Sequence, residues 1–492
     1  MKLSKSKFIS GLTCPKILWL DNNKKEYKED LMNEVILDYG KEVGSLARGL
    51  LGEFILVEFD KNLNNMINTT NELLKEENII VCEASFNYND NFCSIDILKK
   101  EKDEYYIYEV KSSGTLKDIF INDVSYQYYV LTKLGYNVKQ ANLVTLNLNY
   151  VRDEELDINK LFKINDVTES VIEKQQFIEE NITRINKVCN EENEPDIGIS
   201  LHCFKPYPCP YFKYCSRNLP KDNIFTLPGN LKFSINKKVD LYKKGIITYD
   251  DVSNQELDNN TKMVLDYELN DKPDYIDKEH IKEFIDTLTY PLYYLDFETF
   301  HSPIPRYPHT KVYQQVPFQY SLHFMETKNG DLKHREFLGD GITDPRRLLA
   351  EHLVYDIKQN CMVMAYNMEF EKGVIKSLAD TYPDLHDKLM NIYDHCVDLI
   401  VPFKNKYYYS KRMEGSYSIK YVLPALFPNE PKLDYHNLKQ VHNGEEAQDS
   451  YLLLKKKKFI PRLILRHNML KYCGLDTYAM VMIHKKLEEL IK

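Results

Sequence analysis

The amino-acid sequence predicts an α/β protein with two larger domains and a helical connector between them. The chain of 492 residues is long enough for two or three domains. Its content of 43% hydrophobic and 12% aromatic residues argues against global disorder. Runs of strand-forming residues alternate with helical patterns in both halves of the chain. We therefore expect domains at residues 1–215 and 286–492, with the connector at 216–285.

The N-terminal region begins with helical patterning and then changes to short strands. Four charged residues, Glu101 to Glu104, separate two of these strands and predict a hairpin turn. Gly135 ends a helical pattern that leads into a further strand. This order is typical of an α+β or α/β domain. The expected elements are strands at 79–86, 92–98, 105–110 and 141–146, and a helix at 121–134.

The remaining two regions differ in polarity. Residues 216–285 are polar and are interrupted by Pro220 and Pro273, which predicts a small helical connector. The third region starts with a strongly apolar strand at 292–300 and has another at 362–365. It ends in a long amphipathic pattern at about 461–491, which predicts a helix.

The charge of the chain limits the classes of function. There are 65 Lys and Arg against 74 Asp and Glu, a formal charge of −9, which argues against coating nucleic acid through bulk charge. Residues 451–492 differ, with ten Lys or Arg and three Asp or Glu, so that this segment carries +7 and the rest −16. The total charge therefore does not exclude a protein that acts on nucleic acid.

Composition also indicates the compartment. No apolar run reaches the roughly 18–20 residues that span a bilayer, and the apolar stretch after the basic N-terminus is too short for a secretory signal. Ten cysteines are too few for a secreted disulfide scaffold. We expect a cytoplasmic protein with no membrane partner, in which grouped cysteines indicate metal binding.

Three cysteines are grouped near residue 209. Cys203, Cys209 and Cys215 are each separated by five residues in a segment rich in Pro and aromatic residues, and Cys14, followed by Pro15, is a remote candidate for a fourth ligand. Zinc sites usually use closer cysteine pairs, so an iron–sulfur cluster fits the wider spacing better. The alternative is a set of ordinary buried thiols.

A first group of carboxylates lies on the expected hairpin. Strand alternation places Glu109 and Lys111 on one face, and the hairpin brings Asp96 beside them. Two carboxylates can hold a divalent metal against a phosphate while the lysine activates water or offsets charge. Gln127 is expected on the following helix. The alternative is a surface ion pair.

A second group of acids occurs in the C-terminal region. Asp296 and Glu298 face one side of the apolar strand, and Glu371 follows the strand at 362–365 at the start of a helix. Tyr472 and Asp476 are four residues apart on one helical face, with Gly474 between them. Four acids and a tyrosine suit two-metal hydrolysis of phosphodiesters. Each of these short sequence patterns, taken alone, also occurs by chance.

The N-terminal motifs resemble a nuclease family. The order Cys14-Pro15, Asp96, Glu109-x-Lys111, Gln127 and the cysteine triplet is similar to the PD-(D/E)XK nucleases of the RecB-like and CRISPR-associated iron–sulfur exonuclease group, over residues 1 to about 215. The resemblance implies metal binding by Asp96 and Glu109, catalysis by Lys111 and strand contact by Gln127. Gly44 stands where the group usually has a metal-binding His. The implied ligands of a [4Fe–4S] cluster are Cys14, Cys203, Cys209 and Cys215.

The C-terminal motifs resemble the tyrosine-containing DEDD exonucleases of the RNase H-like fold. Asp296 and Glu298 match the first motif, Asn367 to Glu371 the second, and Tyr472 and Asp476 the third. The second motif usually has Asp where this chain has Glu371. The whole architecture is similar to a bacterial family of unknown function, in which an iron–sulfur RecB-like domain is joined to an RNase H-like domain. The implied metal ligands and catalytic groups, for Mg²⁺ or Mn²⁺, are Asp296, Glu298, Glu371 and Asp476, with Tyr472 as a further catalytic residue.

Several residues are candidates for contact with a nucleic-acid strand. Ser416, Tyr417 and Lys420 form one candidate group, and the basic run Lys455 to Lys458, with Arg462 and Arg466, forms another. Tyr407 to Tyr409 could stack bases or belong to a plain strand. A lysine run is also often a solvated face.

The leading hypothesis is a metal-dependent nuclease that hydrolyses DNA or RNA, with single-stranded ends favoured. It would act as a 3′–5′ exonuclease through the C-terminal two-metal site. The iron–sulfur domain would be a second nuclease or a strand-binding module. Two alternatives remain: a nucleic-acid-binding adaptor with one or both sites inactive, which Gly44 and Glu371 motivate, and a structural zinc protein.

Overall fold

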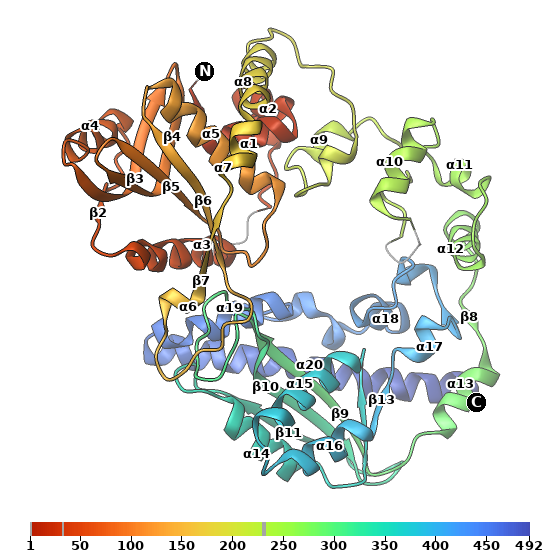
Figure 1. Cartoon of the computed structure of the whole chain (residues 1–492). Coiled ribbons are helices and arrows are strands. Elements are labelled where there is room, and N and C mark those ends of the chain that lie inside the picture. The colour runs from red at the N-terminus through yellow and green to blue at the C-terminus, as the bar shows by residue number, and fades with distance from the viewer. Residues whose placement is uncertain (1, 32–33, 229–232) are drawn as a thin grey trace. The chain divides into compact units, whose positions relative to one another are not determined.

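The computed structural model describes residues 2–31, 34–228 and 233–492 (Figure 1). The chain forms two compact units. Unit 1 comprises Met1–Leu219 and Ser302–Gln314, and unit 2 comprises Pro220–His301 and Gln315–Lys492. Most of the expected connector, from residue 220 onward, therefore belongs to unit 2, and a short segment between two strands of the C-terminal region belongs to unit 1.

Unit 1 is built on a mixed seven-stranded sheet. Its strand order is β2-β3-β4-β5-β6-β7, and β1 pairs with β4 in parallel. Strands β3, β4 and β5 form an antiparallel meander, and β6 lies parallel to β5. The charged segment at 101–104 is the tight turn between β4 and β5, as the sequence predicts. The strands are β1 (Leu3–Ser4), β2 (Ile55–Leu56), β3 (Asn78–Tyr88), β4 (Asn91–Glu101), β5 (Glu104–Val110), β6 (Val138–Leu146) and β7 (Phe162–Asp166).

Helices pack on this sheet because its strands are apolar on both faces. The core helix α5 contacts β3, β4 and the helices α1 and α8, and Phe8 stacks on Tyr126 with ring centroids 4.6 Å apart. On the other face, Val43 and Ala47 of α3 pack with Ile304 and Val312 of the returning segment. The helices are α1 (Lys5–Thr13), α2 (Pro15–Asn23), α3 (Glu34–Ala47), α4 (Leu63–Leu73), α5 (Asp118–Lys133), α6 (Ile158–Leu161), α7 (Thr168–Glu173), α8 (Gln175–Cys189) and α9 (Phe212–Cys215).

Unit 2 is built on a mixed five-stranded sheet with the order β11-β10-β9-β12-β13. Strands β9, β10 and β11 are antiparallel neighbours, whereas β12 lies parallel to β9 and β13 parallel to β12. The strands are β9 (Leu292–Phe300), β10 (Val316–Met325), β11 (Lys333–Leu338), β12 (Met362–Ala365) and β13 (Cys396–Asp398). The bounds of β9 and β12 are those that the sequence predicts.

The two faces of this sheet are covered by different helices. Helix α20 (Phe459–Ile491) packs against β9, β10 and β11. Tyr293, Leu295 and Phe297 form the core of the opposite face with residues of α14 (Arg346–Asp356), α15 (Glu369–Thr381) and α16 (His386–Asp394). Since side chains alternate along a strand, the even-numbered residues of β9 face α20.

The rest of unit 2 consists of short elements. Strand β8 pairs with β14, and three of the helices, α13, α18 and α19, contact α20. The elements are α10 (Ile235–Lys243), α11 (Tyr249–Ser253), α12 (Asn259–Asn270), β8 (Tyr275–Ile276), α13 (Lys278–Asp286), α17 (Val401–Lys404), β14 (Tyr408–Tyr409), α18 (Ile419–Leu426) and α19 (Gly444–Leu453).

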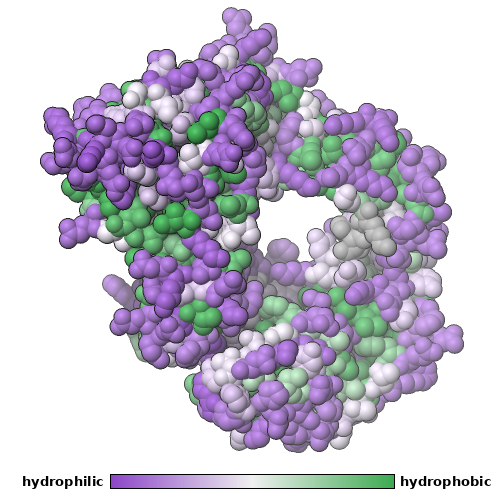
Figure 2. All heavy atoms as spheres, in the orientation of Figure 1, coloured by the Kyte–Doolittle hydropathy of each residue, from purple (hydrophilic) through white to green (hydrophobic). Residues whose placement is uncertain are grey.

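Hydrophilic residues cover most of the face shown in Figure 2. Within the described residues, none of the helices has the length and hydropathy needed to cross a membrane.

The central strand β5 should contribute strongly to the stability of unit 1. Ile107 is fully buried there, whereas Ile164 on β7 is 48% exposed. We expect Ile107→Ala to lower the free energy of unfolding by about 2–5 kcal/mol because it leaves a cavity. The matched variant Ile164→Ala should change it by less than about 1 kcal/mol. Urea unfolding measures both values, and equal effects would contradict this view of the core.

Candidate active sites

Unit 1 brings together the four polar residues that the sequence predicts on its hairpin and helix. Glu109 at the end of β5 accepts hydrogen bonds from Lys111 (2.8 Å) and from Gln127 of α5 (2.6 Å). Asp96 of β4 accepts a hydrogen bond from the backbone N–H of Val110 at 2.7 Å. Gln127 is fully buried in this arrangement, so its side chain orients Glu109.

Two further charged residues complete this centre and were not predicted. Lys5, in the first turn of α1, donates to Glu109 Oε1 at 2.6 Å. Asp123 of α5 pairs with Lys111. Asp123 precedes Gln127 by four residues, so helical spacing could have identified it. No sequence pattern of this kind identifies Lys5, because its position depends on how helix α1 packs against the rest of unit 1.

The N-terminal centre contains its own cations. Burial and the neighbouring Glu109 raise the pKa of Asp96 to about 7, although Lys5 opposes this shift. Burial alone would raise the pKa of Glu109, but Lys111 and Lys5 hold it at about 2. Two ammonium groups thus lie among the carboxylates of Asp96, Glu109 and Asp123, and Glu109 has donors on both oxygens.

The C-terminal centre lies between β9 and α20. Asp296 and Glu298 project from β9 toward α20, and the carboxylates of Glu371 on α15 and Asp476 on α20 are close enough to raise the pKa of Asp296. Tyr472 hydrogen-bonds Asp476 one turn later in α20. All five residues proposed for this site therefore converge.

These carboxylates have few compensating cations. Burial, followed by the neighbouring carboxylates, raises the pKa values of Asp296 and Glu298 well above their usual range. Burial raises the pKa of Glu371 to about 8 and that of Asp476 to about 6. Lys420, which is exposed, opposes the shifts of Glu298 and Asp476. The centre therefore favours bound protons or metal cations.

Hydrogen bonds position the two helices of this centre. Asp398, the last residue of β13, accepts the backbone N–H of Asn367 at 2.9 Å and of Met368 at 3.3 Å, which fixes the start of α15 and hence Glu371. Tyr435 donates to Asp476 Oδ1 at 2.6 Å. Neither Asp398 nor Tyr435 was predicted, because both come from segments without a recognisable motif.

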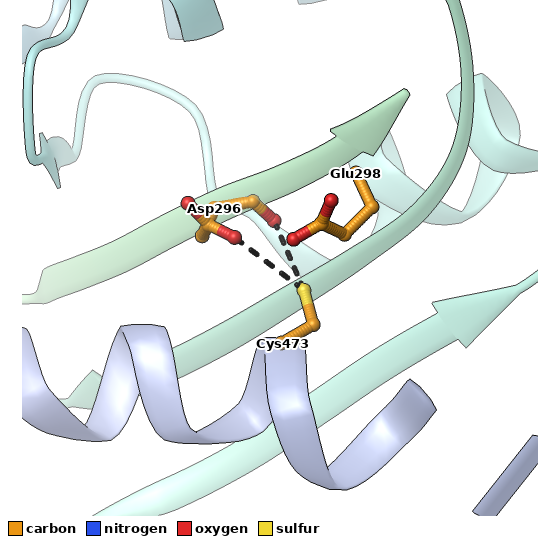
Figure 3. A group of neighbouring side chains, drawn as sticks. All are labelled: Asp296, Glu298 and Cys473. Carbon is orange, nitrogen blue, oxygen red and sulfur yellow. Dashed lines mark hydrogen bonds between the residues drawn. The ribbon is translucent and has the colours of Figure 1, made fainter. Parts of the chain in front are cut away.

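A cysteine also belongs to this centre. The thiol of Cys473 lies 3.5 Å from Asp296 Oδ2 and points to the carboxylates (Figure 3). The ligand atoms of Asp296, Glu298 and Cys473 all lie within 4.8 Å of one another. Such a group could hold a metal ion.

The predicted strand contacts occupy different environments. Lys420 lies near the C-terminal carboxylates, whereas Ser416 accepts the backbone N–H of Ser418 and the Tyr417 carbonyl accepts the hydroxyl of Tyr366. Lys455 to Lys458 are exposed.

Other candidates have structural contacts. Arg462 and Arg466 donate to backbone carbonyls at 338–340. Tyr408 and Tyr409 are buried in β14, so they are strand residues and not exposed stacking partners. At Gly474, a Cβ atom would lie 3.9 Å from His334 Cε1, an ordinary contact.

The four cysteines of the predicted cluster line one pocket of unit 1, together with Lys16. Burial raises the pKa of Cys203 to about 11 and that of Cys209 to about 12. Burial also raises the pKa of Cys14, but hydrogen bonds from the backbone N–H groups of Lys16 and Ile17 oppose this effect. Donors of this kind stabilise thiolate ligands.

The C-terminal centre should make stability depend on pH. Because the pKa of Glu371 rises from 4.5 to about 8 on folding, the folded state holds a proton that the unfolded state releases. This stabilisation is complete below about pH 4 and is lost as the pH rises through about 8. We expect the thermal unfolding midpoint in chelator to fall over this range, and less so in Glu371→Gln.

The matched control is Glu369→Gln, at an exposed position of the same helix. Its pH profile should follow that of the wild type. Parallel profiles for all three proteins would contradict the assignment of a buried, protonated Glu371.

Comparison with known proteins gives one match. Residues 293–418 match a family described as a domain of unknown function, DUF2779. Neither the curated proteins nor the solved structures gave a match. The matched segment contains β9 with Asp296 and Glu298, and α15 with Glu371, so a DUF2779 domain supplies three of the four carboxylates of the C-terminal centre.

Proposed function

We propose that this protein is a metal-dependent nuclease that hydrolyses DNA or RNA at its C-terminal centre. The observation that carries the proposal is the convergence of four carboxylates from β9, α15 and α20, where Lys420 offsets the charges of Glu298 and Asp476. Two divalent cations bound there would supply a hydroxide nucleophile and stabilise the charge on the phosphodiester oxygens. The strand order β11-β10-β9-β12-β13 supports the resemblance to RNase H-like exonucleases.

Residues of the chain have separate roles in this proposal. Asp296, Glu298, Glu371 and Asp476 hold Mg²⁺ or Mn²⁺. The Tyr472 hydroxyl, next to Asp476, orients the attacking water. Lys420 contacts the phosphate backbone, because its charge already acts on Glu298 and Asp476. The tyrosine-containing resemblance favours a 3′–5′ exonuclease acting on single-stranded ends.

The N-terminal domain is assigned a strand-binding role. Its centre has the acids and the lysine of a PD-(D/E)XK site, but Lys5 and Lys111 already neutralise Glu109. A cation is therefore less favoured there than at the C-terminal centre, and Gly44 stands in place of the usual metal-binding His. Hydrolysis is assigned to the C-terminal centre for this reason.

The cysteines of unit 1 fit a [4Fe–4S] cluster better than zinc. In a tetrahedral zinc site the sulfur atoms are about 3.8 Å apart. Cys14, Cys203, Cys209 and Cys215 line one pocket, and the last three are spaced more widely in the sequence than the cysteine pairs of most zinc sites. A larger metal–sulfur group fits this wider sequence spacing better.

The nuclease proposal predicts opposite results at the two centres. Asp296→Asn should lower the rate of cleavage at least about 100-fold, since it removes a metal ligand, whereas Lys111→Ala should leave it within about threefold. The assay uses end-labelled single- and double-stranded DNA and RNA with Mg²⁺ or Mn²⁺, and the position of the label reports polarity.

Asp380→Asn, at an exposed position of α15, is the matched control and should cleave like the wild type. If Lys111→Ala alone abolishes cleavage, the activity belongs to the N-terminal centre. The alternative function, a nucleic-acid-binding adaptor, would be supported by strand binding that persists in chelator without any hydrolysis.

The cluster proposal predicts the metal content. Protein purified without oxygen should contain about four iron atoms and about four acid-labile sulfides per chain. Cys209→Ser should reduce both, because it removes one ligand. Cys93→Ser is a matched control, since Cys93 is buried in the hydrophobic core of the same unit. Zinc in place of iron would refute the cluster.

A further inference from the structure

Cys473 is the one sulfur ligand in the C-terminal group that Figure 3 shows. We propose that Cys473 is a metal ligand and that, with Asp296 and Glu298, it makes this centre a site for thiophilic divalent cations such as Zn²⁺, Cd²⁺ and Co²⁺. The inference rests on the proposed function in taking the centre as a metal site. It goes further by assigning an additional ligand and the class of cation that this ligand selects.

The distances match those of ligands around a single ion. Two ligands of a tetrahedral ion, a sulfur at about 2.3 Å and a carboxylate oxygen at about 2.1 Å, are about 3.6 Å apart. The Cys473 Sγ and Asp296 Oδ2 atoms are separated by 3.5 Å. A ligand oxygen of Glu298 lies within 4.8 Å of both. A cation can therefore be bound by small adjustments of these three side chains.

A second observation at the same centre points to a cation. Glu371 is only 3% exposed, and its Oε2 atom has no hydrogen-bond partner among the residues that the structure describes. Its charge raises the pKa values of both Asp296 and Glu298, so this buried carboxylate lies near the same group. Leaving such a group buried without a partner is costly, and a cation would satisfy it.

The environment of Cys473 differs from that of an ordinary core cysteine. Cys93 is equally buried, but it packs in the hydrophobic cluster of unit 1. The Cys473 thiol instead donates weakly to the backbone carbonyl and the carboxylate of Asp296. Asp476 follows Cys473 by three positions on α20, so both side chains lie on the face of the helix that is turned to the sheet.

The sulfur atom changes which cations the centre binds. Carboxylate and water ligands suit Mg²⁺ and Mn²⁺, whereas a thiolate favours softer ions such as Zn²⁺. Binding of a cation by Cys473 displaces the proton that the thiol donates to Asp296, and this proton is released to solvent. The expected consequence is a higher affinity for Zn²⁺ and Cd²⁺ than for Mg²⁺.

The test is a titration of the full chain with Cd²⁺ or Co²⁺. Binding is monitored by sulfur-to-metal charge-transfer absorption and by calorimetry. The spectrum of Cys473→Ser is subtracted from that of the wild type, so that signals from the other nine cysteines cancel. We expect a difference band that saturates at about one ion per chain, and an affinity for Cd²⁺ at this site at least about tenfold lower in Cys473→Ser. The affinity for Mn²⁺ should change by less than about threefold.

Cys361→Ser is the matched control, because this cysteine of unit 2 is outside the carboxylate group, and it should give no difference band. If Cys473→Ser does not fold, Asp296→Asn, which keeps the thiol, should shift the band of the wild type. Identical spectra and affinities for wild type and Cys473→Ser would overturn the inference even if Asp296-dependent cleavage occurs. A difference band in a protein that cleaves nothing would support the site and refute the nuclease.

Discussion

Carboxylates held between a strand and a helix are the constraint on which unit 2 depends. Alternation along β9 directs Tyr293, Leu295 and Phe297 into the hydrophobic core, so Asp296 and Glu298 must face α20. Removing charged carboxylates from water costs several kcal/mol per ion unless they are compensated. The register of β9 thus fixes both the core and the need for protons or cations on the opposite face.

The surrounding elements orient the carboxylates of this centre. Helix α20 adds Asp476 to the centre, and the hydroxyls of Tyr435 and Tyr472 bond this carboxylate. At the start of α15, Asp398 binds the backbone N–H groups that precede Glu371. These contacts orient the acids but do not neutralise them, because a hydroxyl or amide adds no positive charge. The centre is therefore rigidly built and still short of cations.

Unit 1 has the same residue types but a different charge balance. Its Glu109 is bonded by Lys5 and Lys111, and both ammonium groups are within 2.8 Å of the same oxygen. A divalent ion near that oxygen would meet two like charges. An acid–acid–lysine motif therefore does not by itself set the local charge, which here also depends on Lys5 of helix α1.

Sequence reasoning predicted the parts of the fold that depend on local patterns. The apolar strand at 292–300, the charged turn at 101–104 and the long C-terminal helix were all predicted within a few residues. The two groups of acids were also found, because alternation and helical spacing place their side chains on one face. The segment Ser302–Gln314 was missed, since Arg306 pairs with Glu42 and the burial of Ile304 depends on residues far away in the sequence.

Lys5, Asp398 and Tyr435 were missed for the same reason: each contacts its partner through tertiary packing and lies in no periodic pattern. Cys473 is a different case, because it stands between the motif residues Tyr472 and Asp476 and no pattern in the sequence assigns it a role. Only the direction of its thiol toward Asp296 distinguishes it from Cys93. The formal charge of −9 combines both situations, the ion-paired acids of the N-terminal centre and the largely uncompensated acids of the C-terminal centre. The charge that matters for a bound cation is therefore the local one, and it is set by which lysines the fold brings to each group of acids.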